Sequence, residues 1–200
     1  MFSGIYAIVD AEEGEPQAQL EDVLAGGIRL VQYRAKAGYD RALVRAMRER
    51  AHAAGATLLV NDDLTLLDDA DGVHLGQEDL ATIDRTLLGA RCGWKLLGIS
   101  CPDIASACDA EALGAAYVGV GAMYATVSKA DAGEPIGAAG IRAVVEAVSI
   151  PVVAIGGITL ERIPEVRATG AAMAAVITAI SRAEDRRAAT RALVEAWGQK

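Results

Sequence analysis

The chain has 200 residues and a formal net charge of −8, and 52% of its residues are hydrophobic while 23% are charged. This balance can fill a hydrophobic core, which argues against disorder, and the acidic charge argues against binding to nucleic acid or to an anionic membrane. No apolar run approaches the roughly 20 residues that cross a bilayer, so we expect a cytoplasmic protein.

Short β-rich runs alternate with longer helical patterns along the whole chain, which is typical of βαβ units around a parallel sheet. Amphipathic stretches such as Asp40–Ala54 and Arg182–Trp197 are predicted to form covering helices. Several helices are predicted to end near Gly55, Gly114 and Gly170. No linker interrupts this rhythm, so residues 1–200 are predicted to form one α/β domain, a closed eight-stranded (β/α)8 TIM barrel. The predicted strands are Ile5–Val9, Leu30–Tyr33, Thr57–Val60, Gly72–Leu75, Leu96–Ile99, Tyr117–Val120, Val152–Ile155 and Ala174–Ile177.

The longest irregular segment is Gly121–Gly137, which follows the sixth predicted strand. A loop of this length in a compact domain is often an active-site lid, although a solvated connection is the alternative.

Active sites of such barrels lie at the C-terminal ends of the strands, and polar residues follow nearly every predicted strand here. In chain order they are Gln32, Arg34 and Lys36; Asn61 and Asp62; Gln77, Glu78 and Asp79; Ser100; Thr126, Ser128 and Lys129; Gly156 and Gly157; and Thr178.

Asp62 and Asp79 follow neighbouring strands, so their carboxylates can converge on one hard cation, for which Mg²⁺ is the natural choice. The alternative is that each is a helix cap, a role that Asp often fills after a βα turn. The neighbouring basic residues favour the metal site.

Arg34, Lys36 and Lys129 are candidates for binding a polyanion, because guanidinium and ammonium groups both bind phosphate oxygens. Taken singly, each could instead be an ordinary surface charge. Gly156-Gly157 lets backbone N–H groups approach a phosphate, although such a pair is as often a plain tight turn.

The remaining reactive residues give weaker signals. Cys92, Cys101 and Cys108 lack metal-site spacing and are expected to be reduced thiols, with a catalytic cysteine as a remote alternative. His74 is predicted to be packed and hydrogen-bonded within its strand, and His52 to be exposed on a helix.

Read in order, the strand-end motifs QYRAK, NDD, GVHLGQED and GIS, followed by TVSK and IGGI, resemble the thiamine phosphate synthase family over nearly the whole chain. The resemblance implies a transferase that joins 4-amino-2-methyl-5-hydroxymethylpyrimidine diphosphate to a thiazole phosphate, giving thiamine phosphate and diphosphate. It also implies one Mg²⁺ per active site and small-molecule substrates. We expect either a monomer or a homodimer, and the sequence leaves both open.

The resemblance assigns roles to residues of this sequence. It implies that Asp62 and Asp79 bind Mg²⁺, and that Arg34, Lys36, Ser100 and Lys129 act in catalysis. Substrate contacts are implied for Gln32, Arg34, Lys36, Asn61, Ser100 and Lys129 at the pyrimidine diphosphate, and for Thr126, Ser128, Gly157, Ile177 and Thr178 at the thiazole phosphate. Tyr33, Ala35 and Val127 are further expected substrate contacts, assigned to neither substrate.

The chain departs from the family pattern in places. Ala122 and Ala125 replace prolines and Ser128 replaces threonine in the loop after the sixth strand, which suggests a less rigid loop. Cys101-Pro102-Asp103 stands where a histidine is common, and Thr178 replaces serine.

Two other functions remain open at this stage. A thiazole tautomerase-like isomerase on the same fold would lack diphosphate chemistry, but it is expected to lack the QED element and to carry a histidine after the fifth strand. A non-catalytic regulator that binds thiamine phosphate is the second alternative.

Overall fold

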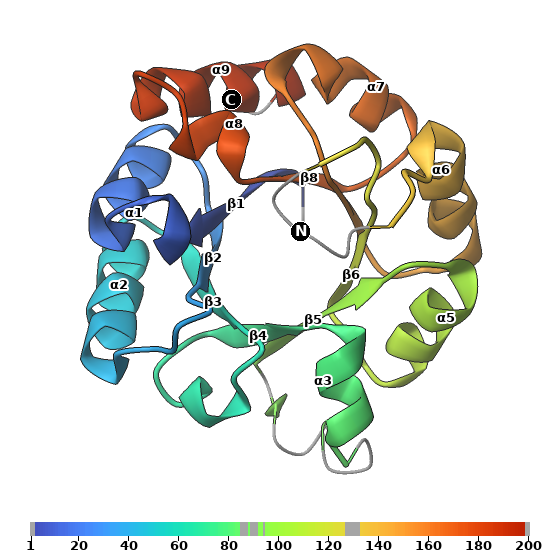
Figure 1. Cartoon of the computed structure of the whole chain (residues 1–200), viewed down its shortest axis with the longest axis horizontal. Coiled ribbons are helices and arrows are strands. Elements are labelled where there is room, and N and C mark those ends of the chain that lie inside the picture. Colours follow the sequence, from blue (N-terminus) through green and yellow to red (C-terminus); the bar gives the residue numbers. More distant parts are fainter. Residues whose placement is uncertain (1–2, 85–87, 89–91, 94, 127–132, 199–200) are drawn as a thin grey trace.

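The computed structural model describes residues 3–84, 88, 92–93, 95–126 and 133–198. Its strands close into a parallel barrel in which each strand pairs with the next and β8 returns to β1. The helices form a ring outside the strands (Figure 1). The strands are β1 (Gly4–Asp10), β2 (Leu30–Arg34), β3 (Thr57–Asn61), β4 (Gly72–Leu75), β5 (Leu96–Cys101), β6 (Tyr117–Val120), β7 (Val152–Ile155) and β8 (Met173–Val176).

The predicted TIM barrel and its strands are therefore confirmed, with strand ends that differ from the predicted ones by at most two residues. Among the described residues no helix is long and apolar enough to cross a membrane. The α-helices are α1 (Pro16–Ala25), α2 (Arg41–Ala53), α3 (Gln77–Thr82), α5 (Ile104–Ala112), α6 (Gly137–Ala147), α7 (Ile163–Ala168), α8 (Thr178–Ser181) and α9 (Arg186–Trp197), and the 3-10 turns are η1 (Ala11–Glu13), η2 (Leu64–Leu66) and η3 (Leu160–Arg162).

The predicted helix Asp40–Ala54 is confirmed as α2, but the predicted start of the last helix at Arg182 is wrong. The short helix α8 ends at Ser181 with Arg182 as its C-cap, and α9 begins at Arg186. The reason is Asp185, whose carboxylate accepts the backbone N–H of Ala188 at 2.8 Å and so caps a new helix.

Side chains alternate along each strand between the barrel interior and the layer under the helices. The interior cluster contains Tyr6, Ile8, Leu30, Leu59 and Tyr117 together with Val153, Met173 and Ala175, while their neighbours in sequence belong to the larger outer core. The same alternation carries Asp10, Gln32, Arg34, Asn61, His74 and Ser100 to inward positions near the C-terminal strand ends. Whether a polar side chain can reach the barrel interior thus depends on which of the two alternating faces of its strand it occupies.

Between β3 and β4 the chain forms only the turn η2, and ion pairs from α2 tie this segment to the barrel. The basic residues are spaced by four, three and four positions, which places them on one face of the helix. Arg41 and Arg45 pair with Asp69, and Arg48 and His52 pair with Asp71.

Candidate active site

A chain of hydrogen bonds crosses the barrel interior and ends at a carboxylate. The hydroxyl of Tyr6 donates to Gln32 Oε1 at 2.7 Å, and Gln32 Nε2 donates to Asn61 Oδ1 at 2.6 Å. Asn61 Nδ2 in turn donates to the carboxylate of Asp62. Gln32 is almost fully buried, so its amide is held by these two bonds and can recognise a ligand only in a defined orientation.

A second branch runs from Tyr6 to the end of β5. The hydroxyls of Tyr6 and Tyr117 lie 2.9 Å apart, and Tyr117 Oη lies 2.9 Å from His74 Nδ1. His74 Nε2 is 2.9 Å from Ser100 Oγ. Gly98 makes this possible, because a Cβ there would come 2.2 Å from Tyr117 Oη. Burial raises the pKa of both tyrosines well above the ordinary value, so they remain protonated.

The carboxylates of Asp62 and Asp79 interact directly, while their shared metal ion stays a prediction. Desolvation and the neighbouring Asp79 carboxylate raise the pKa of Asp62 to about 6, against the lowering effects of the Gly76 N–H and of the Arg34 charge. Asp62 also has a positive φ of 64°, which is uncommon outside glycine and typical of strained functional positions. Two acidic groups and one guanidinium therefore share one end of the barrel.

The helix-cap alternative holds only in part. Asp79 Oδ2 accepts the N–H of Gly76 at 2.9 Å at the start of α3, so this carboxylate does cap a helix. The cap of η2 is Asp63, which accepts the N–H of Thr65 at 2.8 Å, while Asp62 interacts with the N–H of Gly76 at the start of α3.

The donor set suits a hard cation. Mg²⁺ prefers oxygen ligands and usually keeps several waters and substrate phosphate oxygens. Within the part of the chain that the structure describes, no group of three or more His, Cys, Asp and Glu residues could hold a metal ion. Asp62 and Asp79 would therefore supply two carboxylates, and water and phosphate would complete the coordination.

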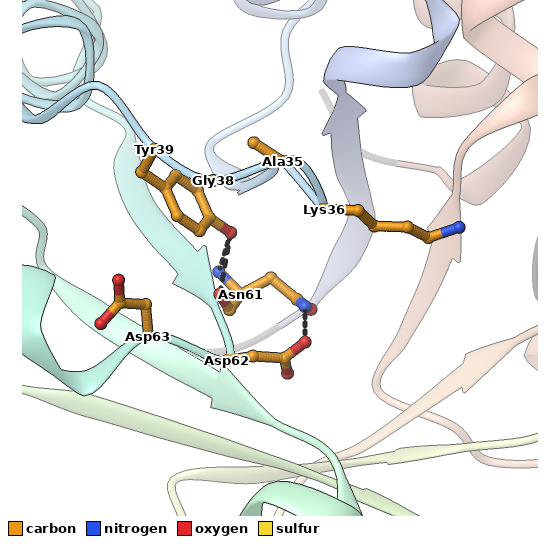
Figure 2. Close-up of a pocket in the computed structure, with 7 residues that line it drawn as sticks. All are labelled: Ala35, Lys36, Gly38, Tyr39, Asn61, Asp62 and Asp63. Carbon is orange, nitrogen blue, oxygen red and sulfur yellow. Dashed lines mark hydrogen bonds between the residues drawn. The ribbon is translucent and has the colours of Figure 1, made fainter.

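A pocket of about 330 Å³ lies between the loops after β2 and β3. In Figure 2 the Tyr39 hydroxyl points at Asn61, and Lys36 extends away from the carboxylate of Asp62. Tyr39 Oη donates to the carbonyl of Asn61 at 2.8 Å and accepts its N–H at 3.1 Å, which ties the β2 loop to the end of β3. The lining residues are Ala35, Lys36, Gly38, Tyr39, Asn61, Asp62 and Asp63, four of which the sequence had placed in the site.

Arg34 and Lys36 both contact carboxylates of the turn after β1. Arg34 Nη1 lies 2.6 Å from Asp10 Oδ2, and Lys36 Nζ lies 3.0 Å from Glu12 Oε2. The Arg34 side chain is 16% exposed, whereas that of Lys36 is 51% exposed. The two candidate cations thus differ in how firmly they are held.

Gly156 and Gly157 serve the packing of the β6 loop. Both have positive φ, and a Cβ on Gly156 would come 2.6 Å from Ala122 Cβ, while one on Gly157 would come 2.5 Å from the Ala125 carbonyl oxygen. The tight turn lets this loop dock, with Tyr124 N–H donating to the Gly156 carbonyl at 3.0 Å. Phosphate binding at these glycines stays a prediction.

The other predicted contacts fall in several places. Thr126 and Gly157 are half-buried in the β6 and β7 loops, and Ile177 and Thr178 are half-buried at the start of α8. The Tyr33 side chain packs in the outer core, on the opposite face of β2 from Gln32. Val127, Ser128 and Lys129 lie outside the described residues, as do positions 127–132 of the expected lid.

Sequence reasoning missed Asp10, Tyr39 and the two interior tyrosines, and it gave His74 only a packing role. The sequence did contain a pattern that predicts Tyr6 and Asp10, because they alternate along β1 on the face that points into the barrel. The contact of Tyr39 had no such signal, since it lies in a loop.

The cysteines and histidines otherwise agree with expectation. The three cysteines are free thiols, and burial raises the pKa of Cys101 to about 12, which disfavours a thiolate. His74 is packed and hydrogen-bonded, and His52 is exposed. The departure at Cys101-Pro102-Asp103 has a structural role, because Asp103 caps α5 by accepting the N–H of Ser106 at 2.8 Å.

Comparisons with known proteins agree on one family. The family model described as thiamine monophosphate synthase matches residues 5–180. The thiamine-phosphate synthase of Moorella thermoacetica is 46% identical over 200 residues, covering 96% of this chain and 94% of that protein. That of Chloroflexus aurantiacus is 41% identical over 198 residues, covering 94% of this chain and 90% of its own length. Among solved structures, the thiamine phosphate pyrophosphorylase from Pyrococcus furiosus superposes with a TM-score of 0.89 at 32% identity, covering 98% and 95% of the two chains.

Proposed function

This chain belongs to the thiamine monophosphate synthase family and is a transferase of thiamine biosynthesis, and we propose that it joins the pyrimidine methyl diphosphate to a thiazole phosphate at the C-terminal end of its barrel. One observation supports this site assignment above all: the Asp79 carboxylate and the Arg34 guanidinium both lie close enough to Asp62 to shift its pKa. Two carboxylates and a guanidinium suit a metal diphosphate better than a neutral ligand.

The diphosphate would bind to Arg34 and Lys36, and to Lys129 from the loop after β6. A departing diphosphate gathers negative charge, and fixed cations stabilise that charge more strongly in the transition state than in the substrate. At an effective dielectric of about 20, one contact near 4 Å is worth roughly 4 kcal/mol before desolvation. No nucleophile from the protein is needed.

Asp62 and Asp79 would hold Mg²⁺, which supplies charge neutralisation to the diphosphate when bound. Desolvation, together with the neighbouring Asp79 carboxylate, raises the pKa of Asp62, so the charged form of this pair is unfavourable without a cation. This is what a preformed cation site requires.

The pyrimidine would lie over the interior polar network. Gln32, Asn61 and Ser100 are oriented there by hydrogen bonds, so their remaining donors and acceptors are available in fixed directions. Ala35 would form part of the wall, and Tyr33 could contribute only through its backbone, because its side chain packs outward.

The thiazole phosphate would bind on the opposite side of the barrel mouth, at the loops after β6, β7 and β8. Phosphate sites in barrels of this fold commonly use the loops after the last two strands. The proposed contacts are Thr126, Val127, Ser128, Gly157, Ile177 and Thr178.

The test is to incubate the protein with both substrates, with and without Mg²⁺, and to measure thiamine phosphate and diphosphate. We expect both products in equal amounts, and only with Mg²⁺. Rearrangement of a thiazole phosphate without diphosphate release would indicate an isomerase, and binding without turnover would indicate a regulator. Either result would contradict the proposal.

A further inference from the structure

The end of β1 and the turn η1 together carry three carboxylates, and each pairs with a different cation at the barrel mouth. Asp10 pairs with Arg34 at 2.6 Å and Glu12 with Lys36 at 3.0 Å, both on the side of β2. Glu13 pairs with Arg182, after α8, at 2.6 Å. The turn η1 therefore bridges the β2 loop and the β8 loop.

Asp10 is fixed from several directions. Its side chain is 5% exposed, with Oδ2 accepting from Arg34 and Oδ1 accepting the N–H of Glu12 at 3.0 Å. Beneath the turn, buried Gln19 donates from Nε2 to the carbonyls of Asp10 and Gly14, each at 3.0 Å. A nearly buried charge pair held this way keeps its geometry, because water cannot easily replace either partner.

Glu12 is held less firmly than Asp10, so its cation can change partners more easily. Its side chain is 55% exposed, and that of its partner Lys36 is 51% exposed. Exposed ion pairs contribute little to stability and are readily replaced, because water competes for both charged groups. A second oxygen contact from Arg34 to Glu12 is long, at 3.8 Å.

We propose that Asp10 is the positioning residue of Arg34, and that Glu12 is a counterion that occupies Lys36 until diphosphate displaces it. Asp10 keeps the guanidinium aimed in the free and bound states alike. Glu12 competes with diphosphate for the same ammonium, so it weakens retention of the product. This inference rests on the proposed function, because it takes Arg34 and Lys36 to be diphosphate ligands.

The first experiment measures binding of inorganic diphosphate with excess Mg²⁺ by titration calorimetry. For Glu12→Gln we expect binding about two- to five-fold tighter than wild type, which is the range that an exposed ion pair allows. Product inhibition by diphosphate should tighten by the same factor. Glu15→Gln is the matched control, because it removes the same charge from an exposed residue between η1 and α1, and Glu15 makes no cap hydrogen bond.

Two results would overturn the role of Glu12. Unchanged affinity in Glu12→Gln would mean that it does not compete for Lys36. Equal tightening in Glu12→Gln and Glu15→Gln would reflect net charge alone.

The second experiment tests whether Asp10 acts through Arg34. Asp10→Asn, which retains an acceptor for the N–H of Glu12, should weaken diphosphate binding roughly ten-fold or more. In an Arg34→Ala background the same change should have no further effect. Additive losses in the double variant would show that Asp10 does not act by positioning Arg34.

These measurements separate this inference from the proposed function. If diphosphate binds wild type no more tightly than Arg34→Ala, the proposed diphosphate site fails and this inference fails with it. If binding depends on Arg34 while Asp10→Asn and Glu12→Gln leave it unchanged, only this inference fails.

Discussion

At the scale of single residues, Asp79 combines two roles that sequence reasoning had treated as alternatives. One oxygen caps the start of α3, and the carboxylate also faces Asp62. A substitution that removes both roles is therefore uninformative, because loss of the cap costs about 0.5–2 kcal/mol by itself. The charge has to be removed while the acceptor is kept.

Asp79→Asn meets this requirement, since its amide oxygen can still accept the N–H of Gly76. We expect activity to fall by roughly two orders of magnitude, because a metal ligand is lost, while the thermal melt stays close to wild type. Asp63→Asn is the control, as it preserves the cap of η2 next to the site and should keep normal turnover. Normal turnover in Asp79→Asn would contradict the metal site.

Asp71 provides a prediction about pH and stability. Burial acts to raise its pKa, but hydrogen bonds from the Leu58 N–H, Arg48 and His52 outweigh burial, and the pKa is lowered. A lowered folded-state pKa adds stability above the unfolded-state pKa, near 4, and this stability is lost as the pH falls through the lower folded-state value.

Asp71→Asn should therefore reduce the free energy of unfolding at pH 7 by about 1–3 kcal/mol, and this deficit should shrink below pH 4. Denaturant unfolding at both pH values measures it. The exposed Asp68→Asn should change little at either pH. A deficit that is independent of pH would exclude the ionic contribution.

At the scale of elements, the Tyr124 side chain adds contacts between the β6 loop and the segment after β7 to the backbone hydrogen bonds already described. The Arg162 guanidinium lies 4.2 Å from the centre of the Tyr124 ring and also donates to the Gly157 carbonyl. The Tyr124 hydroxyl donates to Glu165 at 2.7 Å. This clamp stands beside Ala122 and Ala125, where the family pattern has prolines, so side-chain contacts supply restraint to the described part of the loop.

Gly157→Ala should disturb this docking. Its φ is +63°, and its new Cβ would meet the Ala125 carbonyl oxygen at 2.5 Å. We expect a loss of about 2–4 kcal/mol in unfolding free energy and a higher KM for the thiazole phosphate, with the KM for the pyrimidine diphosphate little changed. Gly55→Ala has a similar φ of +70° but no atom within 4 Å, so it should show the strain alone. Equal effects of the two changes would mean that docking is unimportant.

The elements show where sequence reasoning succeeds and fails. Strands such as Val152–Ile155 were predictable because short apolar runs lie between turn residues. The break between α8 and α9 was not, because Arg182 and Asp185 fit a helical pattern equally well until the cap at Asp185 is formed. The pairing of Asp10 with Arg34 depends on the β1–β2 register, which a single strand does not reveal.

At the scale of the whole molecule, ligand binding and folding are separable. The hydrophobic clusters and the closed set of hydrogen-bonded strands do not depend on the proposed metal site, which uses only side chains at the strand ends. Chelation should therefore abolish activity and leave the melt of the free protein unchanged.

Mg²⁺ and diphosphate together should stabilise the fold through binding. At a ligand concentration of about 100 times the Kd, the gain is about 2.7 kcal/mol, or roughly 5–10 °C in Tm for a domain of this size. Differential scanning fluorimetry with diphosphate in chelator is the control, and it should show a much smaller shift. A fall in Tm on chelation alone would mean that the metal is structural.

The polar network inside the barrel has a defined direction. Because Tyr6 gives its single hydroxyl hydrogen to Gln32, Tyr117 must donate to Tyr6 and so must accept from His74. In the neutral form His74 is then the Nδ1–H tautomer, and in that form its Nε2 accepts the hydrogen of Ser100. With His74 neutral, every hydrogen bond in this chain, from Ser100 to Asp62, runs in the same direction from donor to acceptor. Negative charge on the Asp62 carboxylate therefore polarises the chain as far as the Ser100 hydroxyl. Ser100 consequently presents lone pairs, and acts as an acceptor toward whatever lies over the barrel mouth.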